Sequence, residues 1–162
     1  MVSAEALKKY IFFKGLIDTQ LQMIASIATE ESHAAGAQIY NIGDPAEKLY
    51  IVEEGKLVLV LDSDMGTHRP AMQVNIDFVA NGDAMGWSAL VEPYKYTLRA
   101  LCIEKSKLIA LDAIALRKII HDDPVLGLKI MQSLAKLIAG RLTHTRIILV
   151  GERGLSTLTG EW

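Results

Sequence analysis

The chain has 162 residues, of which 51% are hydrophobic and 22% are charged, and its formal net charge is −2. This length suits one domain, 1–162, with a full hydrophobic core. The weak, mixed charge argues against nucleic-acid binding, and no apolar run reaches the roughly 18 residues that a membrane span needs. Because Cys102 is the single cysteine, an internal disulfide and a multi-cysteine metal site are excluded, and we expect a cytoplasmic protein.

The hydrophobic pattern divides the chain into four segments. Residues 1–35 are expected to hold two N-terminal helices, with Asp18 as the N-cap of the second. Residues 36–111 form short alternating runs separated by glycines, which is typical of a β-roll. Residues 112–150 return to helical spacing, and 151–162 resemble a flexible tail. The expected fold class is therefore α+β and mainly β, with its strands near residues 39–42, 49–52, 57–61, 73–79, 98–103 and 107–111.

The C-terminal helical segment contains an apolar stripe. We expect a short helix capped by Asp112, and then one long amphipathic helix from Pro124 to about Val150. Its apolar residues recur at a and d positions over about three heptads, the lower limit for a coiled coil. The stripe either packs back on the roll or pairs two copies of the chain, and we favour a homodimer because the helix is too long for a small roll to cover. The expected dimer seam consists of Leu128, Met131, Ala135, Ile138, Leu142 and Thr145.

The most informative stretch is GDAMGWSALVEPYKYTLRA at residues 82–100. Gly86 precedes an expected single turn of helix in which Ser88 and Ala89 are small enough to let a ligand approach the backbone. The first turn of a helix has unpaired N–H groups and a positive end, so this stretch has the features of an anion cradle. The alternative interpretation is a packed corner, because a strand–turn–helix corner of any β-rich domain uses the same residues.

Three runs of sequence together resemble the cyclic-nucleotide-binding domain family, the sensory half of catabolite-activator-type regulators. They are FFKGLIDTQL at 12–21, GDPAEKLYIV with EGKL at 43–57, and the stretch at 82–100. The resemblance covers nearly the whole chain, from Leu7 to about Leu149. It implies a double-stranded β-helix, or jelly roll, with N-terminal helices and a long C-terminal helix that dimerises and closes over the ligand. Twelve residues after that helix cannot hold a winged helix, so we expect no DNA binding.

Residues 82–100 fall where this family keeps its phosphate-binding cassette, but the side chains that hold the nucleotide differ. The family has a glutamate on the ribose hydroxyl, where this chain has Trp87. It has an arginine and then a hydroxyl residue on the phosphate, where this chain has Tyr94 and Lys95. We therefore expect cyclic AMP and cyclic GMP to bind weakly or not at all, and a small anion or a flat ring to suit the cradle better. Trp87 either stacks on such a ring or plugs the ribose pocket.

The candidate ligand-binding residues follow from this cassette and from the long helix, where the resemblance implies an adenine contact at Thr145. They are Gly86, Trp87, Ser88, Ala89, Tyr94, Lys95, Tyr96 and Thr145. Arg99 lies just past the cassette and is expected to form a structural ion pair. The four histidines, His33, His68, His121 and His144, have no metal-ligand spacing, and no nucleophile is flanked by a base, so we expect neither a metal site nor an enzyme.

The function expected from these observations is a non-catalytic ligand-sensing or regulatory module that acts on a partner protein. One alternative is a dimerisation or assembly subunit whose pocket is vestigial. A weaker alternative is a truncated transcription regulator. An open cavity beside Gly86, Ser88 and Ala89 would favour sensing, whereas a pocket filled by Trp87 would favour assembly.

Overall fold

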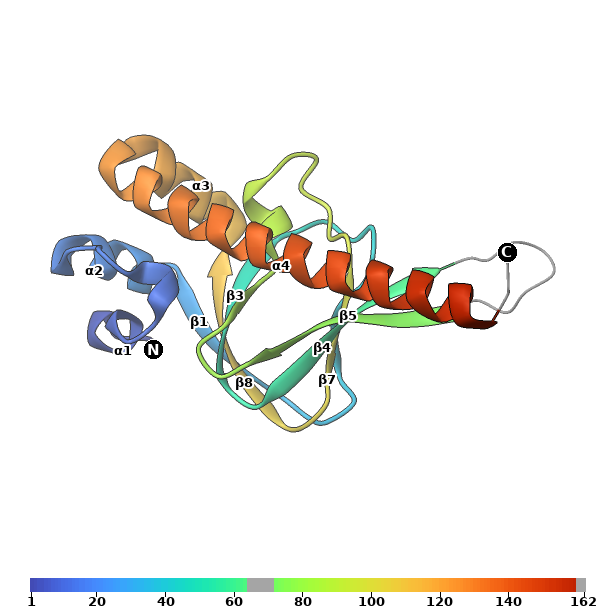
Figure 1. Ribbon diagram of the computed structural model, residues 1–162. Helices are drawn as coiled ribbons and strands as arrows, with labels where there is room; N and C mark the ends of the chain where they lie inside the picture. The colour runs from blue at the N-terminus through green and yellow to red at the C-terminus, as the bar shows by residue number, and fades with distance from the viewer. Residues whose placement is uncertain (64–71, 160–162) are drawn as a thin grey trace.

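The computed structural model describes the backbone of residues 1–63 and 72–159 (Figure 1). Within these residues, eight strands pair antiparallel in two four-stranded sheets, in the orders β1-β8-β3-β6 and β2-β7-β4-β5. The strands are β1 Ala28–His33, β2 Gln38–Tyr40, β3 Lys48–Glu54, β4 Lys56–Ser63, β5 Met72–Ala80, β6 Ala84–Met85, β7 Arg99–Cys102 and β8 Ser106–Asp112. The helices are α1 Ala4–Lys8, η1 Ile11–Phe13, α2 Asp18–Ser26, η2 Trp87–Leu90, α3 Ala113–Asp122 and α4 Pro124–Thr159. The expected mainly-β jelly roll, with N-terminal helices and a long C-terminal helix, is confirmed.

The hydrophobic core lies between the two sheets. Leu49 and Ile51 of β3 and Leu57 of β4 are fully buried, as are Leu108 and Leu111 of β8. Burying a side chain of this size contributes about 1.5–3 kcal/mol to stability, so these buried strand residues hold the roll together.

The helix α4 begins against α3 and then runs across the roll and past it (Figure 1). Asp123 caps α4 by accepting the N–H of Leu126 on its carboxylate, at 3.0 Å. A Cβ atom at Gly127 would lie 2.6 Å from the carbonyl oxygen of Ile120, so only glycine permits this approach of the two helices. The residues that anchor the first turns of α4 are buried and apolar: Leu126, Ile130 and Leu134.

Two helix boundaries differ from the expectation. Ile17, not Asp18, is the N-cap of α2, and its N–H donates to the side-chain oxygen of Gln20 at 3.2 Å. The helix α4 continues to Thr159 instead of ending near Val150, so most of the expected tail at 151–162 is helical, and residues 160–162 lie outside the described part. The expected cap at Asp112 is confirmed, because its Oδ1 accepts the N–H of Ala115 at 2.7 Å.

The strand β1 lies inside the segment 1–35, for which we expected only helices. It pairs with β8 along the edge of its sheet, and its burial pattern leaves most of its residues exposed or half-buried. An edge strand with one solvated face needs few apolar residues, which is why the polar run 29–33 gave no strand signal.

Arg99 forms the expected ion pair, with its Nη2 at 2.8 Å from Oδ1 of Asp62. No helix in the described part combines the length and apolarity needed to cross a bilayer.

Candidate ligand-binding site

The turn at Gly86 has the backbone that the sequence indicated. Gly86 has a φ of 82°, and a Cβ atom there would lie 3.1 Å from the carbonyl oxygen of Lys48. Both the left-handed backbone and the close approach require glycine. The helical turn η2 follows directly, with Ser88 and Ala89 buried. However, the N–H of Ala89 donates to the carbonyl of Gly86 at 3.0 Å, so this expected anion donor is used within the turn.

Three tyrosines occupy the space beside this turn. The rings of Tyr40 and Tyr96 stack with centroids 3.7 Å apart, and the ring of Tyr50 stacks with that of Tyr40 at 6.1 Å. The cavity left beside Gly86 and Trp87 measures about 10 Å³. This is room for about one water molecule, whereas sites for drug-sized ligands typically measure about 300–1,000 Å³. Tyr40 and Trp87 both line this small cavity, and Trp87 also lines the larger cavity described below.

Tyr96, one of the candidate ligand residues, is buried in the core of the roll. Its hydroxyl donates to the carbonyl of Lys48 at 2.6 Å and accepts the N–H of the same residue at 3.2 Å. Burial raises the pKa of Tyr96 to about 12 and moves the pKa of Tyr40 upward as well. Both hydroxyls therefore stay neutral in the physiological range, and that of Tyr96 is already paired with the backbone.

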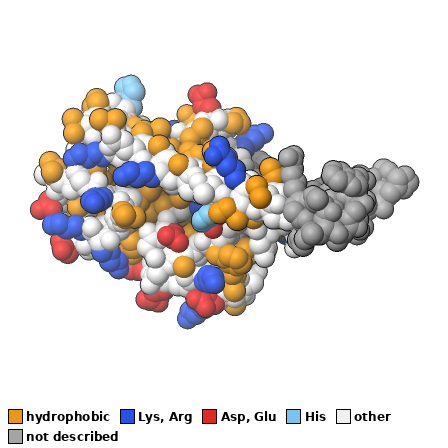
Figure 2. All heavy atoms as spheres, in the orientation of Figure 1, with side chains coloured by type: hydrophobic (Ala, Val, Ile, Leu, Met, Phe, Trp, Pro, Cys, Tyr) orange, Lys and Arg blue, Asp and Glu red, His pale blue; other side chains and the backbone are white. Residues whose placement is uncertain are grey.

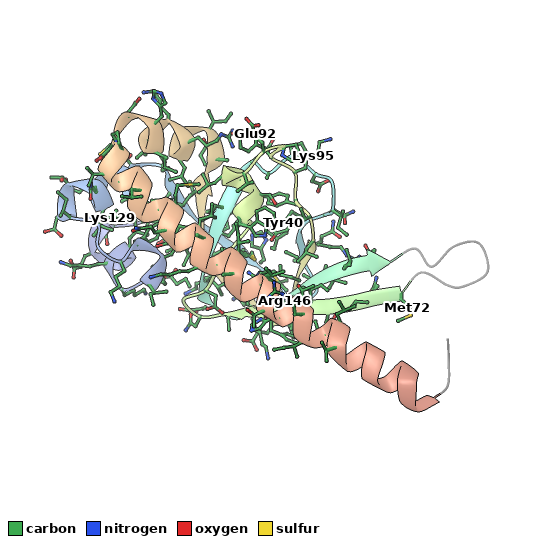
Figure 3. All side chains as sticks on the ribbon, turned by 45° about the horizontal axis from the view of Figure 1, so that its top comes forward. Tyr40, Met72, Glu92, Lys95, Lys129 and Arg146 are labelled. Atoms are coloured by element: carbon green, nitrogen blue, oxygen red, sulfur yellow. The ribbon has the colours of Figure 1, made fainter. Side chains whose placement is uncertain are left out.

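Tyr94 and Lys95 lie away from the cradle. The ring of Tyr94 packs under the guanidinium of Arg117 from α3, with 4.1 Å between the guanidinium carbon and the ring centroid. Arg117 also donates to the carbonyl of Ala89 at 2.6 Å, so it ties the middle of the cassette to α3 at two points. Lys95 is exposed, and Figure 3 shows it at the outer edge of the roll, while Tyr40 lies inside. The ring of Tyr94 thus lies against Arg117 of α3, and Lys95 is exposed to solvent.

A second cavity, which we call the slot, lies between Trp87 and α4. Its volume is about 270 Å³, and its lining residues are mostly apolar. Thr145 reaches the slot from α4, so the structure brings together two candidates, Trp87 and Thr145, that are far apart in sequence. The complete lining comprises Leu61, Ile76, Trp87, Thr97, Leu98, Ile138, Arg141, Leu142 and Thr145.

One buried cation holds α4 on the roll. Arg141 pairs with Asp77 of β5, and the side chains of the two are 11% and 15% exposed. The second guanidinium nitrogen of Arg141 lies 3.4 Å from the carbonyl of Ala84, two residues before Gly86. His144 also lies on Asp77, with 3.0 Å between Nδ1 and Oδ1. Sequence reasoning missed this contact, although an arginine between Ile138 and Leu142 in the apolar stripe of α4 was a visible signal.

The residues of the expected dimer seam are mostly uncovered in the single chain. Leu128, Met131 and Leu142 are 61%, 41% and 50% exposed. Ile138 is the exception, because it packs partly against the core of the roll.

The described residues include no cluster of three or more metal-ligating side chains, and His68 lies outside the described part.

Comparisons with known proteins agree with this architecture. The family model described as cyclic nucleotide-binding domain matches residues 30–123. A protein from Geobacter metallireducens GS-15, described as a cyclic nucleotide-binding protein, is 30% identical with a TM-score of 0.76, and the match covers 88% of this chain and 99% of that one. A cyclic nucleotide-binding domain from Methylobacillus flagellatus KT shares the fold at 17% identity, with a TM-score of 0.75 and coverages of 92% and 81%.

The catabolite activator protein of Thermus thermophilus also shares the fold. It is 24% identical with a TM-score of 0.67, and the match covers 85% of this chain and 61% of the longer protein. The search of curated proteins found no significant match.

Proposed function

We propose that this chain, which belongs to the cyclic nucleotide-binding domain family, is a non-catalytic regulatory module that senses a ligand other than a cyclic nucleotide. The filled cavity beside Gly86 supports the exclusion of cyclic nucleotides, because about 10 Å³ cannot admit a ribose and a phosphate. The outward position of Lys95 supports it too, because the cradle then has no lysine to pair with a phosphate.

The observation that carries the proposal is that the slot and the dimer seam share residues. Ile138, Leu142 and Thr145 line the slot, and the same three belong to the apolar stripe on which two copies of the chain would pair. A ligand in the slot would therefore touch the seam directly. Its binding would change how two α4 helices pack, which is a physical route from ligand to dimer geometry.

The slot favours a flat and largely apolar ligand. Trp87 offers a ring face for stacking, and Leu98 and Leu142 supply apolar walls. Two polar residues of α4, Arg141 and Thr145, line the slot, and both already have partners. Arg141 pairs with Asp77, and the hydroxyl of Thr145 donates to the backbone carbonyl of Arg141. A ligand with a large charge would lose its hydration here without gaining a new partner, whereas a single heteroaromatic ring would lose little.

Tryptophan fluorescence provides the test. The chain has two tryptophans, so Trp162→Phe leaves Trp87 as the single reporter. We expect saturable quenching by indole or adenine, no change with cyclic AMP or cyclic GMP, and a shift in the sedimentation of the protein at saturating ligand. Quenching by cyclic nucleotides at micromolar concentration, or by none of these molecules, would contradict the proposal.

The second candidate function is an assembly subunit with a vestigial pocket. The closed cavity beside Gly86 favours it, since a filled site needs no ligand. In that case Trp87 would respond to none of the planar molecules, while the protein would remain a dimer at every concentration of them. The fluorescence and sedimentation measurements together therefore separate the two functions.

A further inference from the structure

A larger cavity lies on the other side of α4 from the slot, and we call it the basic cleft. Its volume is about 440 Å³, and it is bounded by η1, by the turn from β5 to β6 and by α4. Figure 3 shows Lys129, one of its lining residues, on the side of α4 that faces the N-terminal helices. Figure 2 shows basic and hydrophobic side chains side by side over this part of the surface.

Lysines dominate the charge of the basic cleft. Lys14, Lys129 and Lys136 line it, and in the described structure none of them forms an ion pair with a carboxylate. Lys129 donates to the carbonyl of Gly15, which leaves two of its three N–H donors. Three unpaired cations in one cavity of a chain with a net charge of −2 are a concentration of positive charge that an anion would relieve.

The acidic residues of the basic cleft do not neutralise these lysines. Asp77 is engaged by Arg141 and His144. Asp83 accepts the N–H of Ala80 at 3.0 Å and caps its own turn. The three lysines therefore remain available to a ligand.

The basic cleft also exposes large apolar side chains. Ile11 is 76% exposed, and Phe78 is 51% exposed. Lys56 lies over the ring of Phe78 at 4.9 Å and adds another cation at this edge. Leu137 of α4 also lines the basic cleft. Apolar and cationic groups thus line one cavity, which suits a ligand that has both an apolar body and a negative charge.

We propose that the basic cleft binds an aliphatic carboxylate, in which an extended hydrocarbon chain carries one carboxylate. The lining residues on α4 run from Lys129 to His144, which corresponds to a length of about 22 Å at 1.5 Å per residue. A single ring would leave most of that length empty, whereas an extended chain fills it. The lysines hold the carboxylate, and Ile11, Phe78 and Leu137 cover the hydrocarbon.

This site differs from the slot in place and in ligand. The two cavities lie on opposite sides of Arg141, which lines both. Trp87 lines the slot but not the basic cleft. The emission of Trp87 therefore separates the occupants, because a molecule in the basic cleft does not touch that ring.

The test is calorimetry of the full chain with three probes of equal length: decanoate, decanol and decyltrimethylammonium. We expect decanoate to bind with one site per chain and to weaken as salt is raised. We expect decanol to bind at least about tenfold more weakly, because charge-assisted hydrogen bonds to lysine are lost. No decanoate binding at millimolar concentration, or equal affinity for decanol, would overturn the proposal.

Variants locate the binding. Lys136→Glu and Lys14→Glu change exposed residues and should leave the fold intact, while each weakens decanoate about tenfold. Lys105→Glu makes the same charge change at an exposed position outside the cleft and should leave the affinity unchanged. Ile11→Ser should weaken decanoate and decanol alike. If Lys105→Glu weakens decanoate as much as Lys136→Glu does, the attraction is a property of net charge and the site is refuted.

Discussion

The ring of Tyr40 stacks on the ring of Tyr96 with centroids 3.7 Å apart and planes 10° from parallel. The pair lies against Gly86, where a Cβ atom would be 3.3 Å from Cε1 of Tyr96. An aromatic stack of this kind contributes about 0.5–1.5 kcal/mol beyond its buried area, so opening the space would require breaking a favourable contact. These side chains therefore occupy space directly beside Gly86.

Restoring the two missing side chains should not restore nucleotide binding. For the variant Trp87→Glu with Tyr94→Arg, we expect no gain in affinity for cyclic AMP. An arginine at position 94 would face the guanidinium of Arg117, which now covers the ring of Tyr94, and not Gly86. Equilibrium dialysis with labelled cyclic AMP measures the effect, and a gain of tenfold or more would show that the cradle is open.

The pair Arg141–Asp77 should be a major contributor to the attachment of α4. Removing one partner of a buried ion pair typically costs about 3–5 kcal/mol, so Asp77→Asn should lower the free energy of unfolding by about 3 kcal/mol. Urea denaturation followed by circular dichroism measures this change.

A matched control is the pair Arg99–Asp62, in which the Asp62 side chain is 41% exposed. Asp62→Asn should cost no more than about 1 kcal/mol, because water screens an exposed ion pair. If the two substitutions lower the free energy of unfolding equally, the Arg141–Asp77 pair stabilises the fold no more than an exposed ion pair does.

The dimer seam should be disrupted by one charge. Leu142→Glu places a carboxylate in the expected apolar interface, and the unpaired charge should weaken association by several kcal/mol, on the order of 3 or more. We expect the variant to sediment as a monomer at micromolar concentration, where we expect the unmodified chain to sediment as a dimer. Thr143→Glu makes the same addition at an exposed neighbour off the seam and should leave the dimer intact. A monomeric unmodified chain would end this hypothesis.

Stability should fall at alkaline pH because of the buried tyrosines. The pKa of Tyr96 is raised from 10.0 to about 12 by burial. Because the pKa of Tyr96 is higher in the folded chain than in the unfolded chain, the neutral hydroxyl favours the folded state. This contribution to the free energy of unfolding is complete below pH 10 and is lost as the pH rises toward about 12. Thermal unfolding at pH 9 to 12, with absorbance of ionised tyrosine, tests this. Ionisation of every tyrosine near pH 10 in the folded protein would contradict the prediction.

The sequence was sufficient to predict the roll, because its central strands are short apolar runs and the turns between them contain glycines. It was insufficient for β1, whose polar edge position removes the apolar signal. It also misplaced the end of α4, since the glycines at 151 and 154 have low helix propensity and the helix nevertheless continues through them.

For the candidate site, local backbone geometry could be predicted from the sequence, whereas contacts between distant segments could not. The turn at Gly86 could be predicted because its backbone depends on glycine. The positions of Tyr94 and Lys95 could not, because Arg117 and the strand pairing at Pro45 determine which way they face. The closure by Tyr40 was missed for the same reason, since Tyr40 reaches the cassette from another strand.

The most direct test of the account is calorimetry of the unmodified chain with cyclic AMP and cyclic GMP. Two charge-assisted contacts are missing, at Trp87 and Tyr94, and each such contact contributes roughly 1.5–3 kcal/mol, so affinity should fall by about two to four powers of ten. The closed cavity reduces it further, and we predict no measurable heat of binding with either nucleotide. A dissociation constant in the low micromolar range or tighter for either one would contradict the account.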